Sequence, residues 1–269
     1  MKLFFRKYGE AGPPLIIVHG LYGSGDNWVS IARDLAESFE VFVVDQRNHG
    51  QSPHSEVHDY EAMQEDLREF MDDQGIERAV LIGHSMGGKT IMSFAVKWPE
   101  RVASLISVDI APKAYNNLAL ASRKAPNHSG MINALLSLDV EHAESREDLD
   151  LALRPKIGSE RIRSFLLKNV RRDDSGKFSW RLNLEALNNN LDEIFDGIDP
   201  STVPVGGITG FPVLFISGAE SDYIQVKDHL LIRTLFPVAE FVSIPGAGHW
   251  VHAEQPALLV KTINYFLDI

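Results

Sequence analysis

Cysteine is absent from the 269 residues of this chain. Its absence excludes a disulfide framework, a thiol nucleophile and any metal site built from thiolates. A chain without disulfides fits a reducing compartment, and we expect a cytoplasmic location.

Positive charge and long apolar runs are also scarce. Lysine and arginine number 26 against 37 acidic residues, so the formal net charge is −11. A surface of that sign repels phosphate backbones and anionic lipids, which disfavours nucleic-acid and membrane partners. No apolar run approaches the roughly 18 residues that a membrane span needs, and the run at the start is too short for a signal peptide. We expect a soluble protein with a small-molecule partner.

Short apolar runs rich in β-branched residues alternate with amphipathic stretches of helical length. The runs lie at 15–18, 41–44, 79–82, 102–108 and 213–216, and the helical stretches at 27–38, 60–74, 86–97 and 253–267. Continuous apolar runs suit strands that are covered on both faces, as in a parallel sheet. The alternation predicts a doubly wound α/β sheet, with residues 2–8 as an antiparallel edge strand.

The alternation stops after Asp109. From 111 to 207 the sequence is polar and predicts helices, and the strand pattern resumes at 213. A helical insertion between two strands of one sheet is expected to form a lid. We therefore predict a core of residues 1–110 and 208–269 and a helical lid over 111–207.

The segment Gly83–Gly87, with the sequence GHSMG, matches the pattern G-x-S-x-G. By composition alone a chain of this length shows one such match about one time in ten. Here the match follows a predicted strand and precedes a predicted helix, as a nucleophile elbow requires. The context indicates Ser85 as a nucleophile raised on a strained turn.

A phosphate-binding loop competes for the same residues. Gly83–Thr90 also satisfies G-x-x-x-x-G-K-[ST], and Asp109 after its apolar strand could hold magnesium in such an enzyme. This interpretation explains Lys89 and Thr90 but none of the glycine and histidine loops described next, so we disfavour it.

Two further loops supply what acyl transfer needs. The loop His19–Gly23 follows the first buried strand, and the amides of Leu21 and Met86 are candidates for an oxyanion hole. The loop Gly246–Trp250 follows the last predicted strand and offers His249 as the general base. The order serine, acid, histidine is that of the α/β hydrolases.

Two aspartates are candidates for the acid that orients His249. Asp109 ends the strand after the nucleophile helix, and Asp222 follows the next strand of the sheet. Topology alone favours Asp222, whereas Asp109 could instead bind a loop backbone.

These motifs together resemble the α/β-hydrolase superfamily, and more narrowly the YbfF-type bacterial esterases and their mitochondrial abhydrolase relatives. They are HGLxGS at 19–24, DxRNHGxSP at 45–53, GHSMGGK at 83–89, DIAP at 109–112 and GAGHWVHAE at 246–254. The resemblance covers the whole chain and places Lys89 in the family's own motif. It implies Ser85 as nucleophile, His249 as base and Asp109 as acid, although this chain also carries Asp222. We lean to Asp109.

The resemblance also implies esterase activity on short acyl chains, and no cofactor. We therefore predict a serine carboxylic ester hydrolase that works through an acyl-enzyme. Thioester cleavage on the same machinery, or a ligand receptor that kept the fold without turnover, are the alternatives. A serine at the elbow excludes chemistry that needs a carboxylate nucleophile.

Other polar and aromatic residues receive secondary roles. We expect Tyr22, Tyr115 and Trp250, together with Met86, to edge the substrate pocket. The residues expected to have structural roles are Arg47, Asn48 and His49 in a loop, Phe165, Trp180 and Phe195 in the lid, and His252 and Glu254 at the last helix. The remaining histidines are scattered without metal-ligand spacing, so no metal site is predicted.

Overall fold

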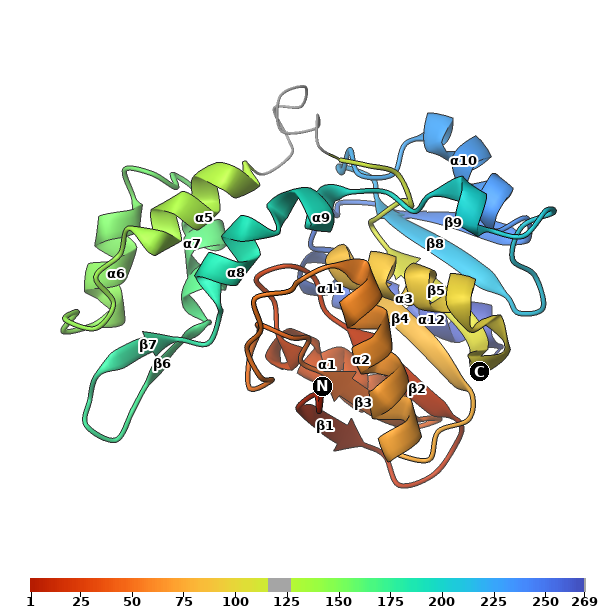
Figure 1. The fold of residues 1–269 in the computed structure, drawn as a ribbon, viewed down its shortest axis with the longest axis horizontal. Helices are drawn as coiled ribbons and strands as arrows, with labels where there is room; N and C mark the ends of the chain where they lie inside the picture. The colour runs from red at the N-terminus through yellow and green to blue at the C-terminus, as the bar shows by residue number, and fades with distance from the viewer. Residues whose placement is uncertain (116–126, 269) are drawn as a thin grey trace.

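The computed structural model describes residues 1–115 and 127–268 and is organised around a seven-stranded sheet. The spatial order is β1-β3-β2-β4-β5-β8-β9 (Figure 1). The strands are β1 (Phe5–Tyr8), β2 (Pro14–Val18), β3 (Glu40–Val44), β4 (Ala79–His84), β5 (Val102–Val108), β8 (Val213–Gly218) and β9 (Ala239–Ile244). β1 pairs antiparallel with β3, and the other neighbours pair in parallel. The predicted mostly parallel sheet with an antiparallel edge strand is confirmed.

Successive apolar residues of the central strands enter two different cores, one on each face of the sheet. In β2, Ile16 and Val18 belong to one core, and Leu15 and Ile17 belong to the other. The first face is covered by α2 (Tyr60–Asp73), α3 (Met86–Lys97) and α10 (His229–Leu235), and the second by α1 (Val29–Leu35) and α12 (Pro256–Leu267). Because helices cover both faces, apolar residues occupy most positions of these strands on both sides of the sheet.

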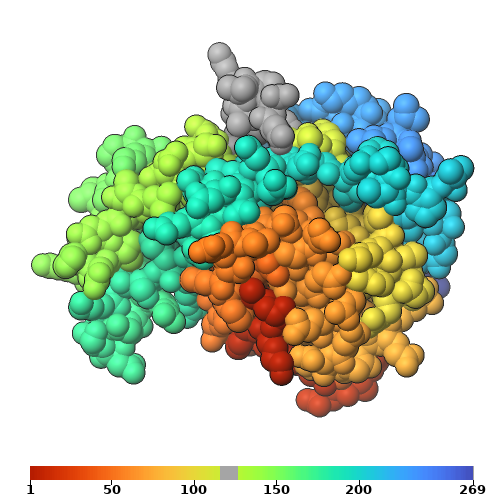
Figure 2. Space-filling model, in the orientation of Figure 1, coloured from red at the N-terminus to blue at the C-terminus, as the bar shows by residue number. Residues whose placement is uncertain are grey.

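A largely helical insertion separates β5 from β8 and extends to one side of the sheet (Figure 1). Its elements are α5 (His128–Leu136), α6 (Arg146–Leu153), α7 (Glu160–Leu167), β6 (Val170–Arg172), β7 (Phe178–Trp180), α8 (Leu184–Asn189) and α9 (Leu191–Phe195). A third apolar core joins these elements to Leu21, Tyr22, Met63 and Met86 of the sheet domain. In the space-filling view, the teal segment with α8 and α9 lies on the core above α2, in orange (Figure 2).

The insertion contains a small strand pair that the sequence pattern did not predict. β6 and β7 form an antiparallel hairpin, with Val170 opposite Trp180. Only Val170 and Phe178 of the hairpin are buried, and they join the third core. Strands of three residues with so few apolar positions leave no clear period in the sequence, which is why this stretch looked helical or irregular.

Residues 1–115 and 127–268 contain neither a candidate membrane-spanning helix nor a candidate metal cluster. No helix there combines the length and the apolar composition that crossing a bilayer requires. Within the same ranges, histidine, aspartate and glutamate form no cluster of three that could hold a metal ion.

The loop after β3 is held to α2 by a buried ion pair. The Nε and Nη2 atoms of Arg47 donate to the two carboxylate oxygens of Asp66 at 2.6 and 2.9 Å, and Arg47 also donates to the carbonyls of Val57 and Ala62. The side chains are only 9% and 2% exposed. These contacts agree with the structural role expected for Arg47.

Replacing Arg47 with methionine should lower the free energy of unfolding by about 3 kcal/mol, because it leaves a buried carboxylate with fewer partners. Urea denaturation followed by circular dichroism measures this change. Arg68→Met on α2 is the control: its pairs with Glu65 and Asp72 are exposed, and its loss should cost at most about 1 kcal/mol. Equal losses in the two variants would contradict the prediction.

Candidate active site

Ser85 sits on a sharp turn between β4 and α3. Its backbone has φ 53° and ψ −122°, an uncommon conformation for a residue with a side chain. The turn is held by glycines: a Cβ at Gly83 would lie 2.3 Å from the carbonyl oxygen of Gly87, and one at Gly87 would lie 2.2 Å from that of Val18. The Ser85 amide also donates to the Val108 carbonyl at 3.1 Å. The surrounding backbone therefore imposes the strained geometry of the elbow.

His249 connects the serine to a carboxylate. Its Nε2 atom lies 3.1 Å from Ser85 Oγ, and its Nδ1 atom lies 2.8 Å from Asp109 Oδ2. If Nδ1 carries the hydrogen and donates to Asp109, Nε2 is free to accept the hydrogen of the serine hydroxyl. Tyr223 stacks on the imidazole with ring centroids 3.8 Å apart. The ring is thus fixed between a carboxylate, a hydroxyl and an aromatic face.

Burial sets the protonation state of the imidazole. It lowers the pKa of His249 to about 3, so the ring is neutral at pH 7 and available as a base. The side chain is still 9% exposed, at the edge of the insertion.

Asp109 is fully buried and accepts three hydrogen bonds. Besides His249, the Gly218 amide donates to Oδ1 at 3.0 Å and the Ser221 hydroxyl donates to Oδ2. Burial raises the pKa of Asp109 to about 7, and the bonds from Ser221 and Gly218 oppose that rise. Because all three groups act as donors, the network favours the ionised carboxylate.

The two aspartates left open by the sequence occupy different positions. Asp109 follows β5, with φ 52°, and is hydrogen-bonded to His249. Asp222 is half-buried in the loop after β8, and its charge contributes to raising the pKa of Asp109. The residues that precede and follow Asp222 contact the triad candidates directly. The Ser221 hydroxyl donates a hydrogen bond to Asp109, and the Tyr223 ring stacks on His249. No motif in the sequence marked either neighbour, so neither Ser221 nor Tyr223 was predicted as part of the site.

The loop that carries Leu21 lies against the elbow. A Cβ at Gly20 would be 3.0 Å from the Cβ of Ser85, which shows how closely the backbones approach. Met86 opens α3, so its amide belongs to the first turn and has no partner within the helix. Leu21, Met86 and Ser85 line one cavity. The two residues whose amides are expected at an oxyanion hole thus line the same cavity as the serine.

That cavity is narrow, at about 20 Å³, which is room for little more than one water molecule. Tyr115 lines it, whereas Trp250 lines a different pocket. Tyr22 is buried beside it, with its ring stacked on that of His128 at 5.9 Å. Its other walls are Tyr60, Lys89, Ile110, His128, Ile194, Phe195 and Tyr223. Ile194 and Phe195 of α9 form part of its wall, so a larger molecule enters only if side chains move.

Lys89 and Thr90 are both engaged inside the protein. The ammonium of Lys89 donates to the carbonyl of Asp196 and lies 4.8 Å from the ring centroid of Tyr115. Burial lowers its pKa to about 7. The hydroxyl of Thr90 donates to Gln46 Oε1 at 2.9 Å. A phosphate-binding loop needs this lysine and this hydroxyl free to reach a nucleotide and its magnesium. Their engagement inside the protein therefore contradicts the phosphate-binding interpretation.

Known proteins resemble this chain along nearly its whole length. A family model described as alpha/beta hydrolase fold matches residues 13–256. The sn-1-specific diacylglycerol lipase ABHD11 of Mus musculus is 37% identical over 261 residues, 95% of this chain and 81% of the mouse protein. Esterase YbfF of Escherichia coli K12 is 35% identical over 257 residues, 95% of this chain and 93% of that esterase.

A solved structure agrees with these sequence relatives. A marine microorganism esterase superposes with a TM-score of 0.91 at 46% identity, over 98% of this chain and 99% of that one. The resemblance stated from the motifs is therefore confirmed. The chain belongs to the α/β-hydrolase fold family, among its esterase- and lipase-type enzymes.

Proposed function

We propose that this protein hydrolyses small carboxylic esters with short acyl chains, through a Ser85–His249–Asp109 triad and an acyl-enzyme. The proposal rests on one observation above all: an unbroken hydrogen-bond chain runs from the Ser85 hydroxyl through His249 to Asp109. The relatives named esterase and lipase support the reaction class. Residues 111–207 act as the lid over a core of residues 1–110 and 208–269, and a cytoplasmic location is part of the proposal.

The reaction proceeds in two halves. Ser85 Oγ attacks the ester carbonyl and its proton passes to His249 Nε2, while Asp109 stabilises the imidazolium. The amides of Leu21 and Met86 donate to the oxyanion. The carbon–oxygen bond to the alcohol then breaks, and the alcohol leaves with the proton from His249. A water molecule, deprotonated by the same ring, attacks the acyl-enzyme and releases the acid.

Ser85→Ala should reduce hydrolysis of p-nitrophenyl acetate by about 10⁴-fold or more in kcat, because the nucleophile is lost. Steady-state kinetics measure the loss. Ser243→Ala is the control, since it removes an exposed hydroxyl from the edge strand β9, and it should keep wild-type activity. If wild type and Ser85→Ala show the same background rate, the protein is a receptor with a hydrolase fold and the enzyme proposal fails.

Asp109→Asn should lower kcat by about 10³ to 10⁴-fold, because an amide cannot stabilise the imidazolium. Asp222→Asn removes one charge from the same edge of the sheet and should lower kcat less than about tenfold. The two variants are compared on p-nitrophenyl butyrate, with circular dichroism spectra to establish that both fold. A larger loss of kcat in the Asp222 variant would identify Asp222, in the loop after β8, as the triad acid in place of Asp109.

The narrow cavity predicts a limit on acyl length. The kcat/KM value should fall from p-nitrophenyl butyrate to the octanoate, because the longer chain has to displace α9 side chains. Phe195→Ala should shift the preference toward octanoate, since it removes a ring from the cavity wall. A wild-type protein that cleaves octanoate as fast as acetate would contradict the short-acyl assignment.

A further inference from the structure

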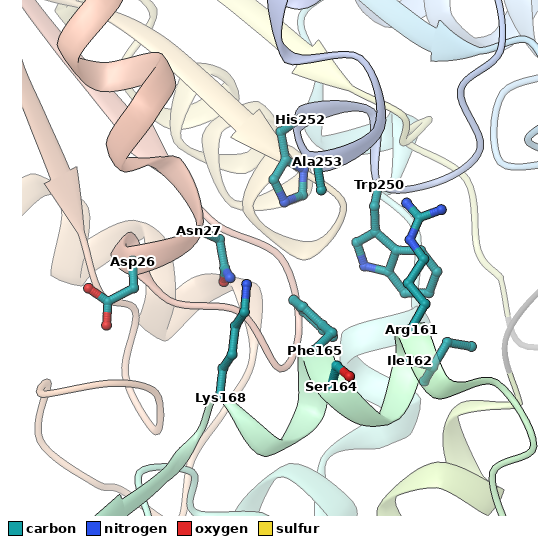
Figure 3. Close-up of a pocket in the computed structure, with 10 residues that line it drawn as sticks. All are labelled: Asp26, Asn27, Arg161, Ile162, Ser164, Phe165, Lys168, Trp250, His252 and Ala253. Carbon is teal, nitrogen blue, oxygen red and sulfur yellow. The ribbon is translucent and has the colours of Figure 1, made fainter.

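A second pocket lies between the insertion and the sheet domain. It has a volume of about 270 Å³ and is walled by η1 (Gly25–Trp28), α7 and α11 (Val251–Glu254), together with Trp250 (Figure 3). Among the described residues, it shares no lining residue with the cavity over Ser85. The mechanism above gives it no role.

Each of the two hollows has a wall residue in ring contact with His249. Tyr223 lines the cavity over Ser85 and stacks on the imidazole at 3.8 Å. Trp250 lines the second pocket and approaches the same imidazole edge-on, with ring centroids 5.8 Å apart. In acyl transfer the leaving group takes its proton from His249, so it has to depart on the side of the histidine. The acyl chain and the leaving group therefore need two separate spaces, and two are present.

The charges around the second pocket leave one cation unbalanced. Arg161 pairs with Glu254, and Asp26 pairs with Arg6 at 2.8 Å. The exposed side chain of Lys168, which lines the pocket, has no carboxylate partner among residues 1–115 and 127–268. Figure 3 shows its side chain reaching from the end of α7 toward Asn27 at the pocket wall. The pocket thus offers an ammonium group that an anion could neutralise.

A buried histidine and two rings complete the pocket. His252 is 5% exposed, its ring is stacked on Trp28 with centroids 4.7 Å apart, and its Nδ1 atom has no hydrogen-bond partner among the described residues. Burial lowers its pKa well below the usual value. The ring is therefore neutral and adds no charge to the pocket wall. Phe165 and Trp250, with ring centroids 5.8 Å apart, supply an apolar wall.

We propose that this pocket binds the leaving group of the substrate, and that the preferred leaving group carries an anionic carboxylate or phosphate. The anion lies at Lys168, and the carbon skeleton lies against Phe165 and Trp250. The ester bond breaks at Ser85, the leaving oxygen takes the proton of His249, and the anionic group departs unchanged. This inference rests on the proposed esterase function and adds the substrate class to it.

The test compares two acetate esters that differ in one charge. The probes are para-acetoxybenzoate, with an anionic leaving group, and its neutral methyl ester. The readout is the ratio of their kcat/KM values, because intrinsic reactivity cancels when this ratio is compared between variants. Lys168→Ala should lower the ratio about fivefold, mainly through KM of the anionic ester, and Lys168→Arg should restore it. Lys177→Ala, an exposed lysine of the insertion that pairs with Glu141, should keep the wild-type ratio.

A leaving group that carries a phosphate instead of a carboxylate is tested with the same variants. Para-acetoxyphenyl phosphate replaces the carboxylate probe, and a larger fall with Lys168→Ala identifies phosphate as the better ligand. A ratio unchanged by Lys168→Ala for both anions overturns the leaving-group proposal while the esterase function stands. If wild type cleaves none of the three probes above the Ser85→Ala background, the esterase function fails, and the leaving-group assignment fails with it.

Discussion

The carboxylate of Asp109 joins the parts of the chain that must meet for this site to exist. It lies at the end of β5 and accepts hydrogen bonds from His249, from the amide of Gly218 at the end of β8, and from Ser221 in the loop beyond. These donors come from segments more than a hundred residues away in sequence. A buried carboxylate is costly without such donors, so the loops after β8 and β9 have to converge on it. Their convergence brings His249 to the serine.

The elbow at Ser85 lies at the other end of this hydrogen-bond network. Packing of Gly83 on Gly87, and of Gly87 on β2, leaves no room for a Cβ, so the backbone strain at the serine is supported by the centre of the sheet. Hydrogen bonds and close backbone contacts therefore hold the sheet edge, the elbow and the histidine loop against one another. A site of this kind gains from preorganisation, because its donors need not rearrange as charge develops.

The insertion shares its packing with the candidate active site. Its apolar core includes Leu21 and Met86, which line the cavity over Ser85. Different helices of the insertion line the two hollows: α9 contributes Phe195 to the cavity over Ser85, and α7 contributes Phe165 to the larger second pocket. The insertion therefore shapes both hollows.

Local patterns in the sequence were enough to predict the sheet, the elbow and the candidate base, because each depends on local rules: apolar runs need two covered faces, and a strained serine needs glycines beside it. The choice between Asp109 and Asp222 stayed open, since parallel strands bring both carboxylates to one edge. That Asp109 contacts the histidine is seen only in the folded chain, because the contact depends on how two distant loops fold over the edge. The same holds for Ser221, for Tyr223 and for the position of Trp250 in a second pocket. Contacts between segments far apart in sequence leave no periodic signal in either segment.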